Sequence, residues 1–158
     1  MQLTIRKATS PDFDHITQLF SETIEAINVK DYSPEQINAW KKGALKKEKW
    51  LKKISEQYFL VCAAGNKIVG FGSITQEGYL DFMYVDKDYQ SKGVASKIYD
   101  SLERFAIDRG IDKIVSDVSI TARPFFERKG FEVFQQQQVD VDGIKLTNYK
   151  MQKRLTLP

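Results

Sequence analysis

The sequence predicts one α/β domain with a mixed, mostly antiparallel sheet of about six to seven strands and about four flanking helices. Its length of 158 residues suits a single domain, expected over residues 1–158. Hydrophobic residues make up 42% and charged residues 28%, as in ordinary globular proteins. Apolar residues recur at helical spacing in the first third of the chain and again after Gly93, whereas strand-like apolar runs fill residues 58–86.

One strand and two helical segments are predicted for the first third of the chain. Residues 3–7 alternate between apolar and polar side chains, as a strand does. A serine followed by a proline, at residues 10 and 33, marks two helix starts, because serine caps a helix and proline fits its first position. Gly43 is expected to break or kink the second helical segment.

Three antiparallel strands in a meander are predicted next. "YFLVCAA" and "KIVGFGSIT" are rich in aromatic and β-branched residues and are joined by the hairpin-type turn "GNK", and "GYLDFMYV" follows. Cys62, the single cysteine, lies in the first of these strands, so we expect a buried core residue and no internal disulfide.

The C-terminal half is predicted to add a helix, a strand, a short helix and a hairpin. The first helix covers residues 93–109 and ends at Gly110. "DKIVSDVS" reads as a buried strand beside the last strand of the meander, and "ARPFFERKG" as the short helix. The Asp142-Gly143 pair is a strong signal for a hairpin between the last two strands.

Charge and terminal sequence limit the classes of function. The formal net charge of +3 permits anionic ligands but lacks the polybasic excess of most nucleic-acid binders. The N-terminus has no secretory signal, and no stretch approaches the roughly 20 apolar residues of a membrane span. We therefore expect a cytoplasmic protein without a membrane partner.

Seven lysines between Lys41 and Lys53 form a basic region. Together with Trp40 and Trp50 they resemble a surface for nucleic acid. Most of them, however, lie on helix faces opposite the apolar stripe, where solvated charge is expected. The sequence therefore favours a solvated face over a nucleic-acid site.

Residues 90–96, "QSKGVAS", join a strand to a helix and could bind a phosphate. A helix N-terminus leaves about four N–H groups free and carries roughly half a positive charge. Gly93 and Ala95 let a ligand approach the backbone closely. The alternative is an ordinary strand-to-helix turn. Neither this stretch nor "GFGSIT" at residues 70–75 completes a Walker or dinucleotide fingerprint.

Two motifs occur in a matching order along the predicted elements. Gln90, Gly93 and Ala95 fit a Q/R-x-x-G-x-G/A pyrophosphate loop, and residues 122–131 fit A-x-x-F-F-x-x-x-G-F. With the order of elements over residues 3–155, they resemble the GNAT superfamily of acyl-CoA-dependent N-acetyltransferases. The resemblance implies the GNAT fold with a V-shaped split between the fourth and fifth strands, and an acyltransferase that uses acetyl-CoA and no metal.

The resemblance also implies where acetyl-CoA binds, namely between strand 77–86 and strand 112–118. The backbone of residues 83–85 would pair with the pantetheine, and the N–H groups of residues 91–96 would hold the pyrophosphate. Ser119 stands where a cofactor-contacting asparagine is common, and it keeps a hydroxyl. The residues expected to contact the cofactor are Met83, Tyr84, Val85, Gln90, Ser91, Lys92, Gly93, Val94, Ala95, Ser96, Ser119, Phe125 and Phe126.

The implied mechanism is direct attack of a neutral amine on the thioester, without an acyl-enzyme. A backbone N–H near Val85, turned inward by a β-bulge, would stabilise the oxyanion. Phe126 stands where many members have the tyrosine that protonates the thiolate, so that role is vacant or has moved to Tyr84 or Tyr89. Asp81 is the first candidate for accepting the proton of the amine. Weaker candidates are Glu22, Glu25 and Asp31.

We therefore predict transfer of an acetyl group from acetyl-CoA to a primary amine by a monomer or homodimer. Residues 24–40, with Tyr32 and Trp40, are expected to shape the acceptor pocket, and Tyr149 could face it. Small molecules and proteins both remain open as acceptors, and the basic region mildly favours one with an acidic group. The alternatives are a catalytically weak acyl-CoA-binding module and a nucleic-acid binder acting through Lys41–Lys53.

Overall fold

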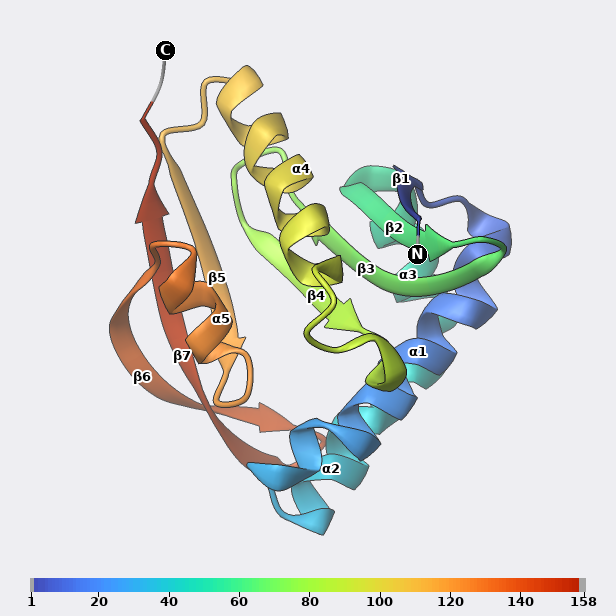
Figure 1. Ribbon diagram of the computed structural model, residues 1–158. Helices are drawn as coiled ribbons and strands as arrows, with labels where there is room; N and C mark the ends of the chain where they lie inside the picture. Colours follow the sequence, from blue (N-terminus) through green and yellow to red (C-terminus); the bar gives the residue numbers. More distant parts are fainter. Residues whose placement is uncertain (1, 157–158) are drawn as a thin grey trace.

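The computed structural model describes residues 2–156, which form a mixture of strands and helices (Figure 1). The strands are β1 (Leu3–Lys7), β2 (Tyr58–Ala64), β3 (Lys67–Ile74), β4 (Leu80–Val85), β5 (Lys113–Ser119), β6 (Glu132–Val141) and β7 (Ile144–Arg154). The α-helices are α1 (Phe13–Ala26), α2 (Pro34–Lys41), α3 (Lys47–Glu56), α4 (Val94–Asp108) and α5 (Arg123–Arg128). Short 3-10 turns lie between them, among them η3 (Lys42–Leu45) and η4 (Lys87–Tyr89).

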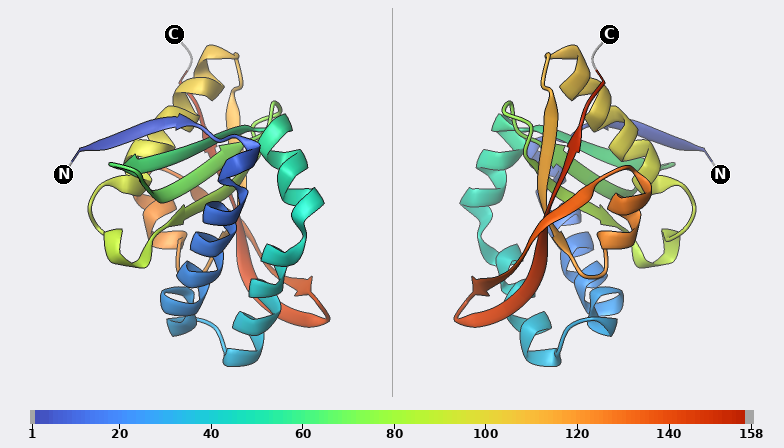
Figure 2. Two further views of the ribbon diagram at one scale, coloured as in Figure 1. Left: turned by 90° about the vertical axis from the view of Figure 1, so that its right-hand side faces the viewer. Right: turned by 90° about the vertical axis from the view of Figure 1, so that its left-hand side faces the viewer.

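The strands form two antiparallel sheets, in the orders β1-β2-β3-β4 and β5-β7-β6 (Figure 2). β4 and β5 run side by side only at their beginnings, through one parallel bridge between Tyr79 and Val115. There the Val115 N–H donates to the Gly78 carbonyl at 3.0 Å, and the buried Ser116 hydroxyl donates to the Leu80 carbonyl at 2.7 Å. The strands then separate, which confirms the predicted split between the fourth and fifth strands.

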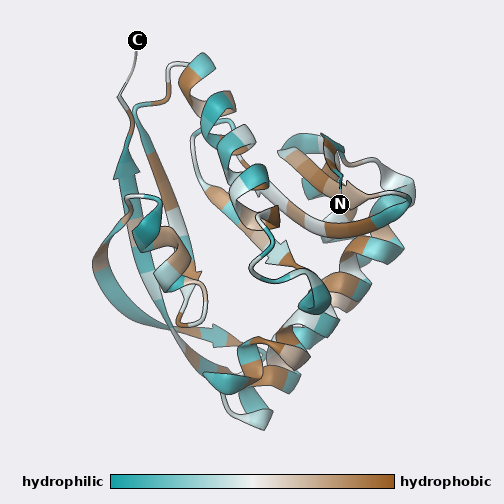
Figure 3. Ribbon diagram, viewed as in Figure 1, coloured by the Kyte–Doolittle hydropathy of each residue, from teal (hydrophilic) through white to brown (hydrophobic). Residues whose placement is uncertain are grey.

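Two apolar clusters lie on opposite faces of the four-stranded sheet. One packs α4 against β2–β4 and continues into the other sheet through Ile114 and Met151. The second packs α1 and α3 against the other face, with Phe59, Phe71 and Trp50 at its centre. Hydrophobic and hydrophilic residues accordingly alternate along the helices in Figure 3. No helix within residues 2–156 is long and apolar enough to cross a membrane.

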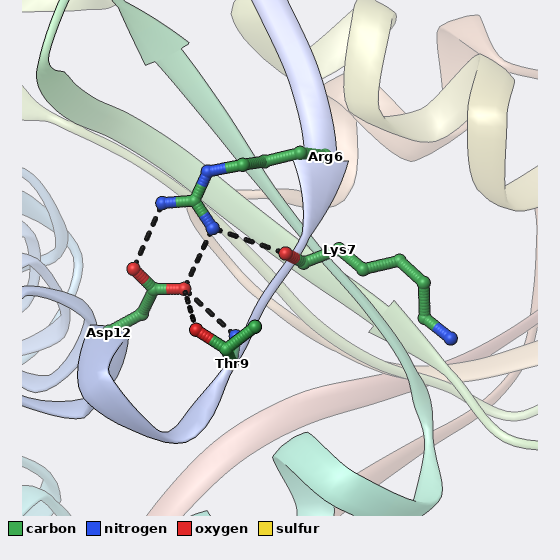
Figure 4. A network of polar contacts seen from close by, with 4 residues as sticks. All are labelled: Arg6, Lys7, Thr9 and Asp12. Carbon is green, nitrogen blue, oxygen red and sulfur yellow. Dashed lines mark hydrogen bonds and ion pairs between the residues drawn. The ribbon is translucent and has the colours of Figure 1, made fainter.

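The entry to α1 differs from its prediction. A 3-10 turn over Ser10–Asp12, with Thr9 rather than Ser10 at its N-cap, precedes the α-helix, whose own N-cap is Asp12. The Asp12 carboxylate accepts from the Thr9 N–H at 2.8 Å and from both terminal nitrogens of Arg6, at 2.8 and 2.9 Å (Figure 4). The ion pair with β1 therefore fixes the turn one residue earlier than the serine-proline signal indicated.

Several local predictions are confirmed. α2 ends at Lys41 and α3 begins at Lys47, so the second helical segment breaks around Gly43. Cys62 is fully buried in β2. Asp142 and Gly143 both have positive φ, 52° and 80°, as a two-residue hairpin turn requires.

Candidate functional site

A cleft of about 500 Å³ opens where β4 and β5 separate. Its walls are β4, the residues that follow β4 up to the first turn of α4, the end of β5 with α5, the α1–α2 region, and the β6–β7 hairpin. Of the residues predicted to bind cofactor, Lys92 does not line the cleft. The others do: Met83, Tyr84, Val85, Gln90, Ser91, Gly93, Val94, Ala95, Ser96, Ser119, Phe125 and Phe126.

The backbone of β4 offers unpaired edge groups to this cleft. The N–H of Asp86, the residue just after β4, donates to the carbonyl of Val69 on β3 at 2.9 Å, so Asp86 and Val69 form a hydrogen-bonded pair. In an antiparallel ladder such pairs alternate with non-hydrogen-bonded pairs, whose N–H and C=O groups point away from the partner strand. The register of Met83 opposite Gly72 and Val85 opposite Gly70 therefore directs both of their N–H groups away from β3, into the cleft.

The carbonyl of Val85 is occupied by two side chains. Thr23 of α1 donates its hydroxyl to it at 3.0 Å, and Gln90 donates its side-chain amide at 2.7 Å. Gln90 thus ties the loop after β4 to the strand and does not aim its amide at a ligand. Thr23 was not singled out from the sequence as a site residue; the only available signal was a polar residue within the buried stripe of α1.

The loop before α4 presents backbone N–H groups to the same cleft. Ser91 and Gly93 have φ values of 58° and 84°, and α4 begins at Val94. The Lys97 N–H is bonded to the Gly93 carbonyl at 3.0 Å, so the N–H groups just before it lie in the unpaired first turn. Successive amides in such a turn form a concave anion site. A Cβ added at Gly93 would meet no atom within 4 Å, so the space beside this residue is open.

The opposite wall consists of the end of β5 and α5. The Ser119 hydroxyl accepts from the Ala122 N–H at 3.0 Å, which fixes the turn into α5. Phe126 is only 3% exposed and packs edge-on against Phe125 and Phe131. An aromatic ring without a hydroxyl therefore closes this wall.

Asp81 is displaced by an irregularity in β4. Ser73 lies opposite Phe82 but Ile74 lies opposite Leu80, so Asp81 is an extra residue, a β-bulge. Its carboxylate forms an ion pair with Lys53 at 2.9 Å and accepts a hydrogen bond from the Gln57 side chain at 2.8 Å, both on the α3 side. The bulge expected near Val85 thus lies four residues earlier, and ordinary alternation directs the Val85 amide.

Aromatic rings from three elements meet at the other end of the cleft. Tyr32 and Trp40 pack edge-on at 5.3 Å between ring centroids, and Tyr84 packs on Phe20 at 5.0 Å. Burial raises the pKa of Tyr84 well above its usual range, against a smaller lowering by the Trp40 side chain. The Tyr84 hydroxyl therefore stays protonated at neutral pH.

Tyr149 and Asp117 lie on the neighbouring strands β7 and β5, and of the two Asp117 lines the cleft. Tyr149 is not among the lining residues, and the Arg123 guanidinium covers its ring at 4.6 Å. Asp117 does line the cleft, although no sequence signal beyond strand alternation marked it. It accepts from the Tyr79 hydroxyl at 2.6 Å and from Gln137 at 3.0 Å.

The lysines of the basic region are not part of the cleft wall, although Lys53 pairs with Asp81, which lines it. None of its seven lysines lines the cleft, and three are paired: Lys41 with Glu25, Lys42 with Asp142, and Lys53 with Asp81. Within residues 2–156, no group of three or more His, Cys, Asp or Glu side chains is placed to hold a metal ion.

Comparisons with known proteins agree on one family. The profile of the "Acetyltransferase (GNAT) domain" matches residues 28–153. The "Uncharacterized N-acetyltransferase YafP" of Escherichia coli K12 is 33% identical over 149 residues, which are 94% of either chain. A crystal structure of a GCN5-related N-acetyltransferase from Rhodopseudomonas palustris superposes with a TM-score of 0.94 at 30% identity, over 98% of this chain and 97% of that one. The PaiA N-acetyltransferase of Thermoplasma acidophilum, solved in complex with coenzyme A, shares the fold with a TM-score of 0.80 at 22% identity, over 98% and 100% of the two chains.

Proposed function

This chain belongs to the GNAT acetyltransferase family, and from that premise we propose that it transfers an acetyl group from acetyl-CoA to a primary amine by direct attack. One observation carries the proposal: the outward N–H groups of β4 and the free first turn of α4 face the same cleft. The pantetheine arm of acetyl-CoA is extended and contains amides, so it suits a free strand edge. The pyrophosphate suits free N–H groups at a helix N-terminus, and acetyl-CoA needs the two features side by side. The PaiA N-acetyltransferase of Thermoplasma acidophilum, solved in complex with coenzyme A, supports the same ligand.

The proposed chemistry uses groups on the cleft wall. The amine nitrogen bonds to the thioester carbon, and the oxyanion that forms is stabilised by the outward N–H of Val85 or Met83. The intermediate then expels the thiolate of coenzyme A. Asp81, which lines the cleft, takes one proton of the incoming ammonium. The Tyr84 hydroxyl, on the same wall, gives its proton to the thiolate and regains one from the nitrogen of the intermediate, which thereby becomes the amide.

Substitution of Gly93 tests the cofactor site. Gly93→Glu places a carboxylate where the pyrophosphate binds, so the increase in Tm that acetyl-CoA causes in the wild type should disappear. Gly65→Glu is the matched control, because Gly65 also has positive φ and open space but lies in the β2–β3 turn. Thermal unfolding with and without acetyl-CoA measures both variants. An undiminished shift in Gly93→Glu would contradict the proposed site.

Removal of the Tyr84 hydroxyl tests the proton donor. We expect Tyr84→Phe to lower kcat by about 100-fold, since general acid catalysis contributes roughly 10²–10⁴-fold. Acetyl-CoA should bind it as tightly as the wild type. Tyr89→Phe, which alters the other tyrosine on this wall, should keep the wild-type kcat. Thiol release with an amine panel gives the rates, and equal kcat values in all three proteins would remove Tyr84 from the mechanism.

The buried Phe126 favours one second candidate, a catalytically weak module that binds acyl-CoA. The same thiol-release assay separates the two: this candidate predicts tight binding of acetyl-CoA with no turnover on any amine.

A further inference from the structure

We propose that the acceptor is a small primary amine with an apolar body about the size of one aromatic ring, and that extended polypeptides are excluded. This inference rests on the proposed function, since it assigns a substrate class to the same cleft. Three features of the acceptor end support it. The edge of β7 is already hydrogen-bonded to side chains, the α1–α2 region is held over the cleft by several polar contacts, and the lining consists of aromatic and aliphatic side chains.

The first feature is the free edge of β7. β5 ends at Ser119, opposite Asn148, so residues 144–147 of β7 extend beyond it with no strand on that side. Such an edge could bind an extended peptide through main-chain hydrogen bonds. Here the Lys145 carbonyl accepts from the Gln36 side chain at 2.8 Å, and the Thr147 carbonyl accepts from the Tyr32 hydroxyl at 2.7 Å. A peptide strand would have to displace both.

The second feature is the set of hydrogen bonds and the ion pair that hold the α1–α2 region over the cleft. The buried Tyr32 hydroxyl also accepts from the Ile120 N–H at 2.9 Å. Next to it, the Thr121 hydroxyl donates to Asp31 at 2.7 Å. Farther out, Lys42 pairs with Asp142 in the β6–β7 hairpin at 2.9 Å. In Figure 1, α2 accordingly lies against the end of this hairpin and closes that end of the split. An extended polypeptide that passed through the site would have to displace the α1–α2 region.

The third feature is the chemistry of the lining. The aromatic residues Tyr32, Trp40 and Tyr84 are joined there by Ile27, Val139 and Leu146. An aromatic face attracts an ammonium group, and burial of apolar atoms favours a ring-sized body. Of the residues from the α1–α2 region that line the cleft, Lys30 is the one with a charge, and it is exposed. Elsewhere on the cleft wall, among the described residues, the carboxylates are Asp81 and Asp117, which are too few to form a row for a polycation.

The test measures binding of amines to the complex with coenzyme A, which carries no acetyl group, so catalysis is not needed. Calorimetric titration uses 2-phenylethylamine, ethanolamine and an extended hexapeptide with a free N-terminus. We expect 2-phenylethylamine to bind at least tenfold more tightly than either of the others. Trp40→Leu should weaken it about tenfold, because it removes the π face and keeps an apolar side chain.

Leu45→Ala is the matched control on the neighbouring turn, because Leu45 is 82% exposed and does not line the cleft; it should leave the affinity unchanged. An unaltered affinity for coenzyme A verifies that each variant is folded. Preferred binding of the hexapeptide, no binding of 2-phenylethylamine, or an unchanged affinity in Trp40→Leu would each overturn the inference. A different result would contradict the proposed acetyl transfer itself, namely that no amine of any class releases thiol from acetyl-CoA.

Discussion

Side chains next to the cleft are positioned by partners that take no part in the proposed chemistry. Gln90 and Thr23 bind the Val85 carbonyl, which leaves the amide of that residue as the group offered to a ligand. The Ser119 hydroxyl accepts from the Ala122 N–H in the turn into α5. Gln90 and Ser119 therefore contribute to the site by fixing the backbone around it.

The Arg6–Asp12 pair predicts how stability depends on pH. The hydrogen bonds from Arg6, and those from Thr9, lower the pKa of Asp12 from 3.8 to about 2. A carboxylate with a lowered pKa in the folded state stabilises the protein fully above its unfolded pKa, and this stabilisation is lost as the pH falls from about 4 to about 2. Since the Arg6 side chain is 49% exposed, solvent screening reduces the effect to about 1–2 kcal/mol.

Asp12→Asn removes that dependence. At pH 7 the variant should be less stable than the wild type by about 1–2 kcal/mol, and the difference should shrink toward pH 2. Urea unfolding at a series of pH values measures it. A constant difference across this range would show that the ion pair is not its source.

At the level of elements, α4 packs on β3 at two glycines. A Cβ at Gly72 would lie 2.7 Å from Ile98 Cγ2 and 3.1 Å from the Phe82 carbonyl oxygen, and one at Gly70 would lie 2.7 Å from Val94 Cγ1. The glycines therefore let the helix that carries the candidate phosphate loop lie close to the strand beside β4. The loop and the β4 edge reach the same cleft because of this contact.

Gly72→Ala should destabilise the protein by about 1–3 kcal/mol, because α4 must move away from β3. Gly43→Ala is the control: its new Cβ would meet Phe20 at an ordinary 3.7 Å, and its stability should equal or exceed that of the wild type by up to ~1 kcal/mol. Chemical denaturation compares the two, and equal stabilities would argue against close packing at Gly72.

For the whole molecule, the cleft exists because the two sheets touch only at one end. Ser116 joins them there through its bond to the Leu80 carbonyl. Beyond that point, the α1–α2 region ties the sheets together again across the acceptor end, through Tyr32 and its partners on β7 and after β5. The cavity between these two connections holds the candidate site.

Two serine-to-alanine variants test the connection at the narrow end. Ser116→Ala leaves the Leu80 carbonyl without this partner and should cost about 1–2 kcal/mol of unfolding free energy. Ser73 is equally buried, but its hydroxyl has no partner among the described residues, so Ser73→Ala should be neutral or stabilising. Urea unfolding of both is the measurement; a larger loss in Ser73→Ala would contradict this account.

The sequence by itself determined the order of elements, the turns and the position of the candidate phosphate loop, because these depend on local periodicity and on residues such as Gly93 and Gly143, which adopt positive φ more readily than other residues. The structure alone decided where side chains point. The bulge that turns Asp81 toward Lys53 and the capping of the β7 edge by Tyr32 depend on strand register and on contacts between residues up to 115 positions apart. No local pattern encodes such pairs, since packing of distant elements sets them.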